Sequence, residues 1–120
     1  METFEQLEIW KRSCRLCADL YKTLEPCRAY GFRDQITRSA LSVPSNIAEG
    51  YERNSSKEFV RFLKIAKGSC GELRTQLYIG VEAGFLEKTK TKGLVTEATE
   101  IAKMIQGLIR KISLKNSRNP

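Results

Sequence analysis

Apolar residues recur at alternating spacings of three and four along most of this 120-residue chain, and polar breaks separate the apolar stretches. Such spacing places apolar side chains on one face of an α-helix. The pattern predicts helices over about residues 5–24, 33–50 and 56–83, and a fourth from the polar loop 87–92 to about residue 114. Four amphipathic helices joined by short loops predict an all-α fold, an up-down-up-down antiparallel four-helix bundle.

Two local signals mark the ends of these helices. Glu25-Pro26 ends the first helix, because a proline ring disfavours helical geometry at the residue before it. Ser55 and Glu58 form a capping box, in which the serine is the N-cap of the third helix and the glutamate is its third residue.

Pro44 interrupts the second predicted helix. Proline has no N–H to donate to the carbonyl of Ala40, and its ring crowds that carbonyl, at a cost near ~3 kcal/mol in a regular helix. The helix therefore either kinks at Pro44 or ends and restarts there. Ser42 and Ser45 are candidates to satisfy the backbone groups that the proline frees.

The two middle helices each carry an ordered second face besides the face expected to enter the core. In the second helix this face lies opposite Ile36, and in the third it lies beside the main apolar stripe. We interpret these faces as junctions between helices or subunits, in preference to a catalytic site. Gly68, Gly71 and Gly80 indicate close backbone approach in the third helix. The candidate junction residues are Arg38, Asn46, Glu49, Arg53, Ile65, Gly68 and Glu72.

The chain has no histidine and four cysteines. The absence of histidine excludes Ser-His and Cys-His catalytic pairs, His-liganded zinc and Glu-x-x-His di-iron sites. Cys14 and Cys17 form a Cys-x-x-Cys pair, but both fall on the predicted buried stripe, where cysteine packs as a small hydrophobe. We expect no metal and no cofactor. Catalysis would need Glu49 or Glu72 to have a raised pKa in a cleft. Nothing in the sequence requires such a carboxylate, so we expect the protein not to be an enzyme.

The net charge of +7 is concentrated near the C-terminus. Residues 1–87 hold 13 Lys and Arg against 12 Asp and Glu, whereas residues 88–120 hold 8 against 2. This asymmetry favours an anionic partner, although cations also complement a helix C-terminus and keep a protein soluble. Lys92, Lys103 and Arg110 project outward along one line about 27 Å long, with no aromatic residue in that strip. The candidate nucleic-acid-binding residues are Lys88, Lys90, Lys92, Lys103, Arg110, Lys111, Lys115 and Arg118.

The chain begins with an acidic segment and contains no apolar run of the roughly 18 residues that span a bilayer. We therefore expect a soluble, cytoplasmic protein that does not enter a membrane. One domain is expected over residues 1–115, followed by a polar, frayed tail over residues 116–120.

Several short motifs carry a resemblance to a known family. They are Val43-Pro44-Ser45-Asn46-Ile47-Ala48-Glu49-Gly50 with Arg53, Glu58-Phe59, Phe62-Leu63, Ile65-Ala66, Gly68-Ser69 and Glu72-Leu73, together with Phe4, Leu7, Ile9 and Trp10 near the start. Over about residues 4–113 the chain resembles the four-helix-bundle proteins whose genes occur in intervening sequences of bacterial 23S rRNA genes. Val43 stands where isoleucine is commoner.

The resemblance implies a homopentameric ring of bundles, similar in architecture to the accessory proteins of diversity-generating retroelements. Those relatives resemble basic, nucleic-acid-associated scaffolds that work with a reverse transcriptase. The resemblance implies no enzymatic activity.

Two functional hypotheses follow. The first is a homo-oligomeric bundle, an RNA- or DNA-binding scaffold that acts through phosphates on its basic C-terminal helix. The second is a protein-interaction scaffold that recruits a protein partner on the second faces of its middle helices, with no nucleic acid bound and with the basic end serving solubility.

Overall fold

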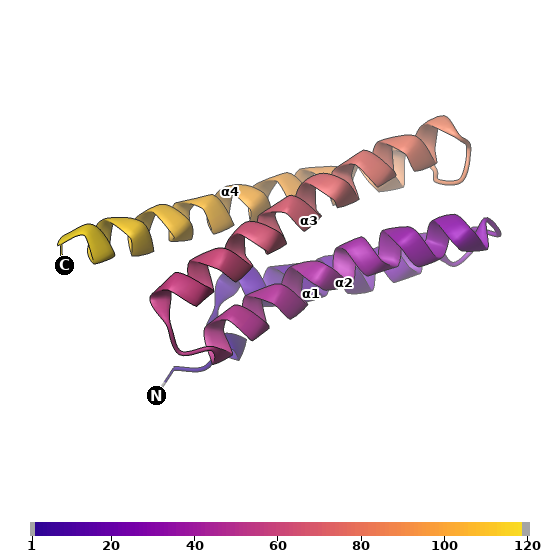
Figure 1. Cartoon of the computed structure of the whole chain (residues 1–120). Helices are drawn as coiled ribbons and strands as arrows, with labels where there is room; N and C mark the ends of the chain where they lie inside the picture. The colour runs from indigo at the N-terminus through magenta and orange to yellow at the C-terminus, as the bar shows by residue number, and fades with distance from the viewer. Residues whose placement is uncertain (1, 119–120) are drawn as a thin grey trace.

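The computed structural model describes residues 2–118, and all of its regular elements are helices. A short 3-10 helix, η1 (Phe4–Gln6), precedes α1 (Glu8–Leu24), α2 (Tyr30–Glu52), α3 (Ser56–Glu82) and α4 (Lys88–Arg118). The predicted all-α fold is confirmed. Successive long helices run in alternating directions, consistent with the predicted up-down-up-down order (Figure 1).

Each long helix packs against two others. α1 contacts α2 and α4, and α3 contacts the same two helices, so the four helices enclose one core along a body of 52 × 22 × 20 Å. Each helix contributes fully buried apolar side chains, among them Leu24, Ile47, Leu63 and Ile101.

Four helix ends differ from the prediction. Residues 4–6 form a separate turn before α1, and α2 begins at Tyr30. α4 begins at Lys88, inside the predicted polar loop, because the Glu87 carboxylate accepts hydrogen bonds from the backbone N–H groups of Thr89 and Lys90 at 2.9 and 3.1 Å. These bonds hold the pKa of Glu87 below its usual value. The predicted tail begins within α4, which continues to Arg118, and residues 119–120 lie outside the described residues.

Pro44 neither ends nor restarts α2, which is continuous from Tyr30 to Glu52. The Ala40 carbonyl that loses its N–H donor instead accepts a hydrogen bond from the Cys17 thiol of α1, with Sγ 3.1 Å from the oxygen. Burial raises the pKa of the Cys17 thiol to about 12, and Cys14 and Cys70 act in the same direction, so the thiol keeps the proton that it donates. The donor to this carbonyl is therefore a residue of another helix and neither of the two candidates, Ser42 and Ser45.

Two glycines allow close packing between helices. A Cβ atom at Gly50 would lie 2.6 Å from the Cβ of Phe62, and one at Gly80 would lie 2.6 Å from both Phe32 and Leu86. The predicted close backbone approach is not what is found at Gly80, where the side chains of Phe32 and Leu86, and not another backbone, pack against the glycine. The prediction is also wrong within the subunit for Gly68, where a Cβ would meet no described atom within 4 Å, and for Gly71, where it would meet only Arg74, at 3.8 Å.

The thiol–carbonyl contact predicts an unequal effect of two cysteine substitutions. Cys17→Ala removes both the donor and a buried side chain, so we expect the free energy of unfolding to fall by about 1–3 kcal/mol. Cys14→Ala is the matched control, because Cys14 is only partly buried. We expect it to cost less than half as much in urea unfolding followed by circular dichroism. Equal losses would show that the contact contributes nothing.

Candidate nucleic-acid interface

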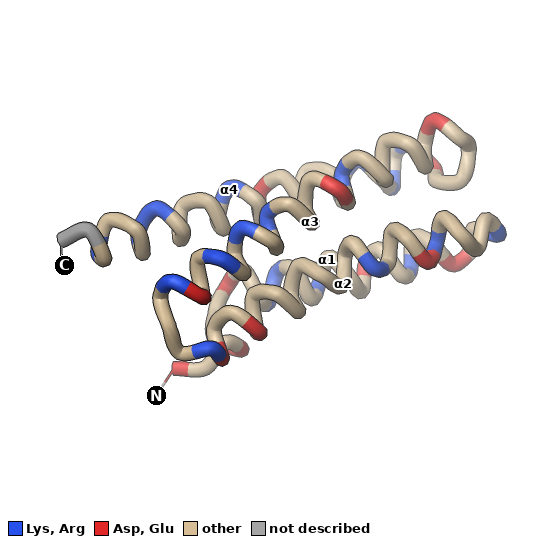
Figure 2. The backbone as a smooth tube through the Cα atoms, in the orientation of Figure 1, with Lys and Arg blue, Asp and Glu red and all other residues tan. Residues whose placement is uncertain are grey.

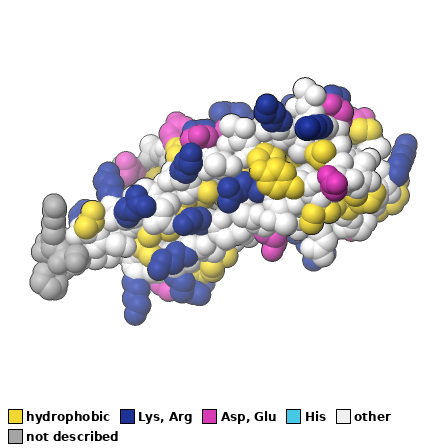
Figure 3. Space-filling view, turned by 90° about the horizontal axis from the view of Figure 1, so that it is seen from above, with side chains coloured by type: hydrophobic (Ala, Val, Ile, Leu, Met, Phe, Trp, Pro, Cys, Tyr) yellow, Lys and Arg dark blue, Asp and Glu magenta, His cyan; other side chains and the backbone are white. Residues whose placement is uncertain are grey.

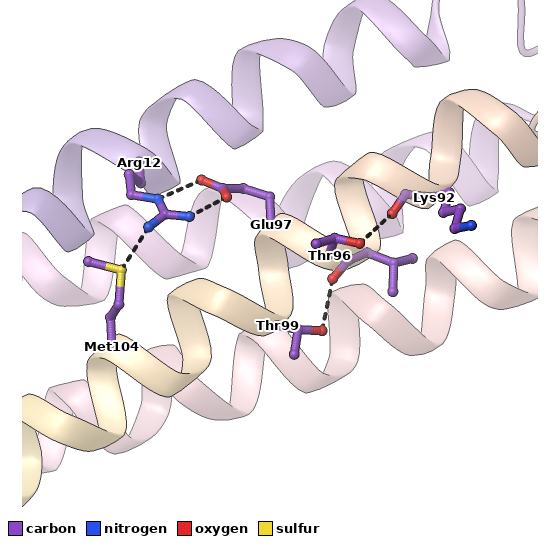
Figure 4. Close-up of polar contacts among 7 residues, drawn as sticks. Arg12, Lys92, Thr96, Glu97, Thr99 and Met104 are labelled. Atoms are coloured by element: carbon purple, nitrogen blue, oxygen red, sulfur yellow. Dashed lines mark hydrogen bonds and ion pairs between the residues drawn. The ribbon is translucent and has the colours of Figure 1, made fainter.

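An ion pair joins α1 to α4, the basic helix. The Arg12 guanidinium donates to both carboxylate oxygens of Glu97, with Nε 2.8 Å from Oε2, and Nη1 donates to Sδ of Met104 at 3.1 Å (Figure 4). The side chains of this pair are 29% and 30% exposed. The Arg12 hydrogen bond holds the pKa of the Glu97 carboxyl below its usual value.

The opposite side of α4 carries the basic strip predicted from the sequence. Lys92, Lys103 and Arg110 are exposed and share one side of the helix, and within residues 2–118 none of them forms an ion pair. Thr96 and Thr99 lie on the same side and donate to the carbonyls of Lys92 and Val95, one turn back (Figure 4).

Lys88, Lys90, Lys111 and Lys115 are exposed as well, but they do not all join this strip, and the side chain of Arg118 lies outside the described part of the chain. Lys88 lies near it, whereas Lys90 lines a different groove, with Lys22 and Thr23 of α1. Lys111 and Lys115 are exposed farther round the helix. Only part of the predicted basic set therefore shares one side of α4. These residues are Lys88, Lys92, Lys103 and Arg110.

α3 adds cations that the sequence reading did not include. Lys67 donates to Oε1 of Gln106 at 2.7 Å, and Nη1 of Arg74 lies 3.5 Å from Oγ1 of Thr99. These contacts bring one side of α3 beside the strip of α4 (Figure 2). We call the combined surface the α3–α4 face, and its cations are Lys57, Lys64, Lys67, Arg74, Lys88, Lys92, Lys103 and Arg110.

The view from above in Figure 3 shows this side of the bundle, where Lys and Arg side chains outnumber acidic ones. The α3 cations recur at spacings of seven, three and seven, from Lys57 through Lys64 and Lys67 to Arg74. That periodicity was available in the sequence. The net charge of residues 1–87 conceals this basic side of α3, because the whole stretch is nearly neutral. Only the distribution of charge around the helix separates its basic side from its acidic side.

At one end of the α3–α4 face the two helices form a groove. Its walls include Tyr78 and Glu82 from α3 and Lys88, Lys92 and Thr96 from α4. Tyr78 is 63% exposed. The basic strip of α4 has no aromatic residue of its own, but α3 places one beside it.

The second faces of α2 and α3 meet along one boundary, which we call the α2–α3 face. Ser39 donates to Oε1 of Glu72 at 2.6 Å, the hydroxyls of Ser42 and Ser69 lie 2.8 Å apart, and Asn46 donates to the carbonyl and hydroxyl of Ser42. The residues of this face are Arg38, Ser39, Ser42, Asn46, Glu49, Ile65, Gly68, Ser69, Glu72, Gln76 and Ile79.

The remaining junction candidates fall into two groups. Arg53 pairs with Glu49 at 2.9 Å, lies 3.8 Å from Glu58, and stacks over the Phe62 ring at 5.0 Å, so it helps close the turn between α2 and α3. An Arg61 hydrogen bond lowers the pKa of Glu58. In contrast, Arg38, Ile65 and Gly68 are exposed, and within residues 2–118 the Arg38 side chain makes no hydrogen bond or ion pair.

The described part of the chain contains no group of three or more Cys, Asp and Glu residues placed to hold a metal ion. Cys70 is buried, and burial raises the pKa of its thiol to about 11. Glu49 and Glu72, the carboxylates that catalysis would need, are exposed, and each accepts a hydrogen bond. None of the helices over residues 2–118 has an apolar stretch suited to crossing a bilayer.

These features define a four-helix bundle with a basic face, and the comparisons with known proteins agree on the fold. The chain is similar to the crystal structure of a protein of unknown function from the S23 ribosomal protein family of Bacteroides thetaiotaomicron VPI-5482, with a TM-score of 0.77. The two are 24% identical, over 84% of this chain and 97% of that one. No curated protein matches this chain.

The family model described as 23S rRNA-intervening sequence protein matches residues 5–107. The chain therefore belongs to the 23S rRNA-intervening sequence protein family, which confirms the resemblance carried by its central motifs.

The Arg12–Glu97 pair predicts a pH dependence of stability. A carboxylate whose pKa is lowered in the folded state stabilises the fold above its unfolded pKa, and loses that contribution as the pH falls through its folded pKa. We expect Glu97→Gln to be about 1 kcal/mol less stable than the parent at pH 7, and this difference to shrink as the pH falls below about 4.5.

Urea unfolding at a series of pH values measures that difference. Glu100→Gln is the control, because Glu100 is an exposed carboxylate of the same helix without the Arg12 hydrogen bonds. A Glu97→Gln difference that stays constant from pH 7 to pH 3 would contradict the assignment.

Proposed function

We propose that the protein is a non-enzymatic, homo-oligomeric bundle that binds RNA or DNA through phosphates on the α3–α4 face. One observation carries this proposal: two helices place their cations on the same side of the bundle, where contacts such as Lys67–Gln106 hold them together. A cationic surface drawn from two rigid helices binds a polyanion by releasing its condensed counterions. Because phosphates carry no sequence information, such binding tolerates many sequences.

The comparisons are compatible with an RNA partner. The family takes its name from intervening sequences of 23S rRNA, and the similar crystal structure is assigned to a ribosomal protein family. Both labels concern those proteins, and an RNA ligand for this chain remains part of the proposal.

The oligomer, which we propose to be a pentamer, would use the α2–α3 face. Ile65 and Ile79 are 42% and 53% exposed there, and the space over Gly68 is open. Apolar side chains beside an open glycine suit the close approach of another helix. A closed ring requires each subunit to offer two different surfaces to its neighbours, and the α2–α3 face would be one of them.

One observation favours a second candidate function, a protein-interaction scaffold in which the cations serve only solubility. Oε1 of Gln76 is buried on the α2–α3 face and has no hydrogen-bond partner within the described residues. A buried unsatisfied acceptor is costly, and a small shift of the Gln76 side chain when a different protein docks on this face would bring its oxygen to a donor of that protein.

The nucleic-acid proposal predicts a salt-dependent affinity that depends on the α3–α4 face. Purified protein should bind labelled structured RNA and duplex DNA, with an affinity that falls steeply as salt rises. Lys103→Glu/Arg110→Glu should weaken binding about tenfold or more at low salt and reduce the slope of log K against log salt by about 2.

Lys11→Glu/Lys22→Glu is the matched control, because it changes the net charge equally at exposed positions of α1. We expect that variant to bind nearly as well as the parent. If the parent binds neither nucleic acid at low salt, the proposal is wrong and the protein-interaction scaffold becomes the better account.

The oligomer predicts that a side chain at Gly68 blocks assembly without harming the fold. A Cβ at position 68 meets no described atom of its own subunit within 4 Å, and Gly68→Leu removes a helix-interior glycine, so the subunit should be as stable as the parent or about 0.5–1 kcal/mol more stable. We expect analytical ultracentrifugation to show an oligomer for the parent and a smaller species for Gly68→Leu.

Gly107→Leu is the control for this experiment, since Gly107 on α4 has equally open space around it. It should sediment as the parent does. A parent that is monomeric at micromolar concentration, or a Gly68→Leu variant that still assembles fully, would show that the α2–α3 face is not a subunit contact.

A further inference from the structure

Tyr78 lies beside the basic residues of α4 at one end of the α3–α4 face. It is 63% exposed, which makes it the most exposed large hydrophobic side chain of the described residues. Its hydroxyl makes no hydrogen bond to any of those residues. The core therefore does not account for an aromatic ring at this position.

The surroundings of the ring have a distinct chemistry. Tyr78 shares a groove with Lys88 and Lys92, which are four residues apart and so lie on the same side of α4. Val81 and Val95, both partly buried, add apolar surface to the groove. An exposed ring, an apolar lining and two neighbouring ammonium groups are the features that bind one unpaired base and the phosphates beside it.

This combination favours a single strand over a duplex. Bases in a duplex stack on each other, so their faces are closed to a protein side chain, whereas an unpaired base can place its face on an aromatic ring. Duplex binding would use only the cations of the face and would gain nothing from Tyr78.

Glu82 also lines the groove and opposes the two lysines. Its carboxylate repels phosphate, so the backbone of a bound strand is expected on the α4 side of the groove, near Lys88 and Lys92. Lys103 follows Lys92 by about 16 Å along α4, which lets one strand continue from the groove along the basic face.

We propose that Tyr78 is a stacking platform for an unpaired base of single-stranded RNA or DNA, with Lys88 and Lys92 holding the adjacent phosphates. This inference rests on the proposed nucleic-acid function and deepens it. It separates the face into two parts: phosphate contacts along its length and one base contact at the groove.

The test compares a single-stranded oligonucleotide with a blunt duplex of the same length, at one salt concentration and then across a salt series. Tyr78→Ala should weaken single-strand binding about tenfold and leave duplex binding within about twofold. Tyr78→Phe keeps the ring and should bind within about twofold of the parent. Tyr21→Ala is the matched control, because Tyr21 is an exposed tyrosine of α1.

Two further readouts distinguish stacking from charge. Stacking releases no counterions, so Tyr78→Ala should leave the salt slope unchanged, whereas Lys88→Glu/Lys92→Glu should reduce it by about 2. The fluorescent base 2-aminopurine in the single strand should be quenched by the parent and by Tyr78→Phe, but not by Tyr78→Ala.

The outcomes separate this inference from the function on which it rests. If the parent binds both nucleic acids and Tyr78→Ala binds the single strand as well as the parent does, the inference is wrong and the proposed function stands. If the parent binds neither nucleic acid, both the inference and the proposed function are wrong. A change in the sedimentation of Tyr78→Ala would place Tyr78 at a subunit contact and would also overturn the inference.

Discussion

α2 is continuous through Pro44, and another helix supplies a hydrogen bond in place of the one that the proline removes. Pro44 leaves the Ala40 carbonyl without its usual donor inside the bundle, and the Cys17 thiol of α1 occupies that position. An unsatisfied buried carbonyl would favour a break in the helix. The bond satisfies this carbonyl, and α2, which runs unbroken to Glu52, presents polar side chains to α3.

Polar contacts between neighbouring helices help to position each helix of the bundle. Ser42 and Ser69 align α2 with α3, and Lys67 and Gln106 align α3 with α4. The contacts of Arg12 with α4 then align α4 with α1, so that each pair of neighbouring helices named here has a polar contact. These polar contacts lie at the borders of the apolar core and add to the packing that fixes the axial register of the helices. The basic residues of α3 and α4 share a face because of that register.

The sequence predicted the fold class because apolar periodicity reports directly on helices. It missed the start of α4, where the Glu87 cap looked like part of a charged loop. Contacts between distant residues were harder to foresee: nothing near Ala40 indicates that Cys17 would be its donor. Half of the candidate basic face was missed because its α3 members lie in a nearly neutral segment, and Tyr78 becomes notable only once α4 lies beside it.

The thiol–carbonyl contact also constrains how this sequence can change over time. Cysteine at position 17 is needed as a hydrogen-bond donor only while proline occupies position 44, since any other residue there would return an N–H to the Ala40 carbonyl. Positions 17 and 44 are therefore expected to change together, although they lie on different helices. Among related chains, replacement of the proline should precede or accompany loss of the cysteine, and such covariation would link α1 to α2 without any knowledge of the fold.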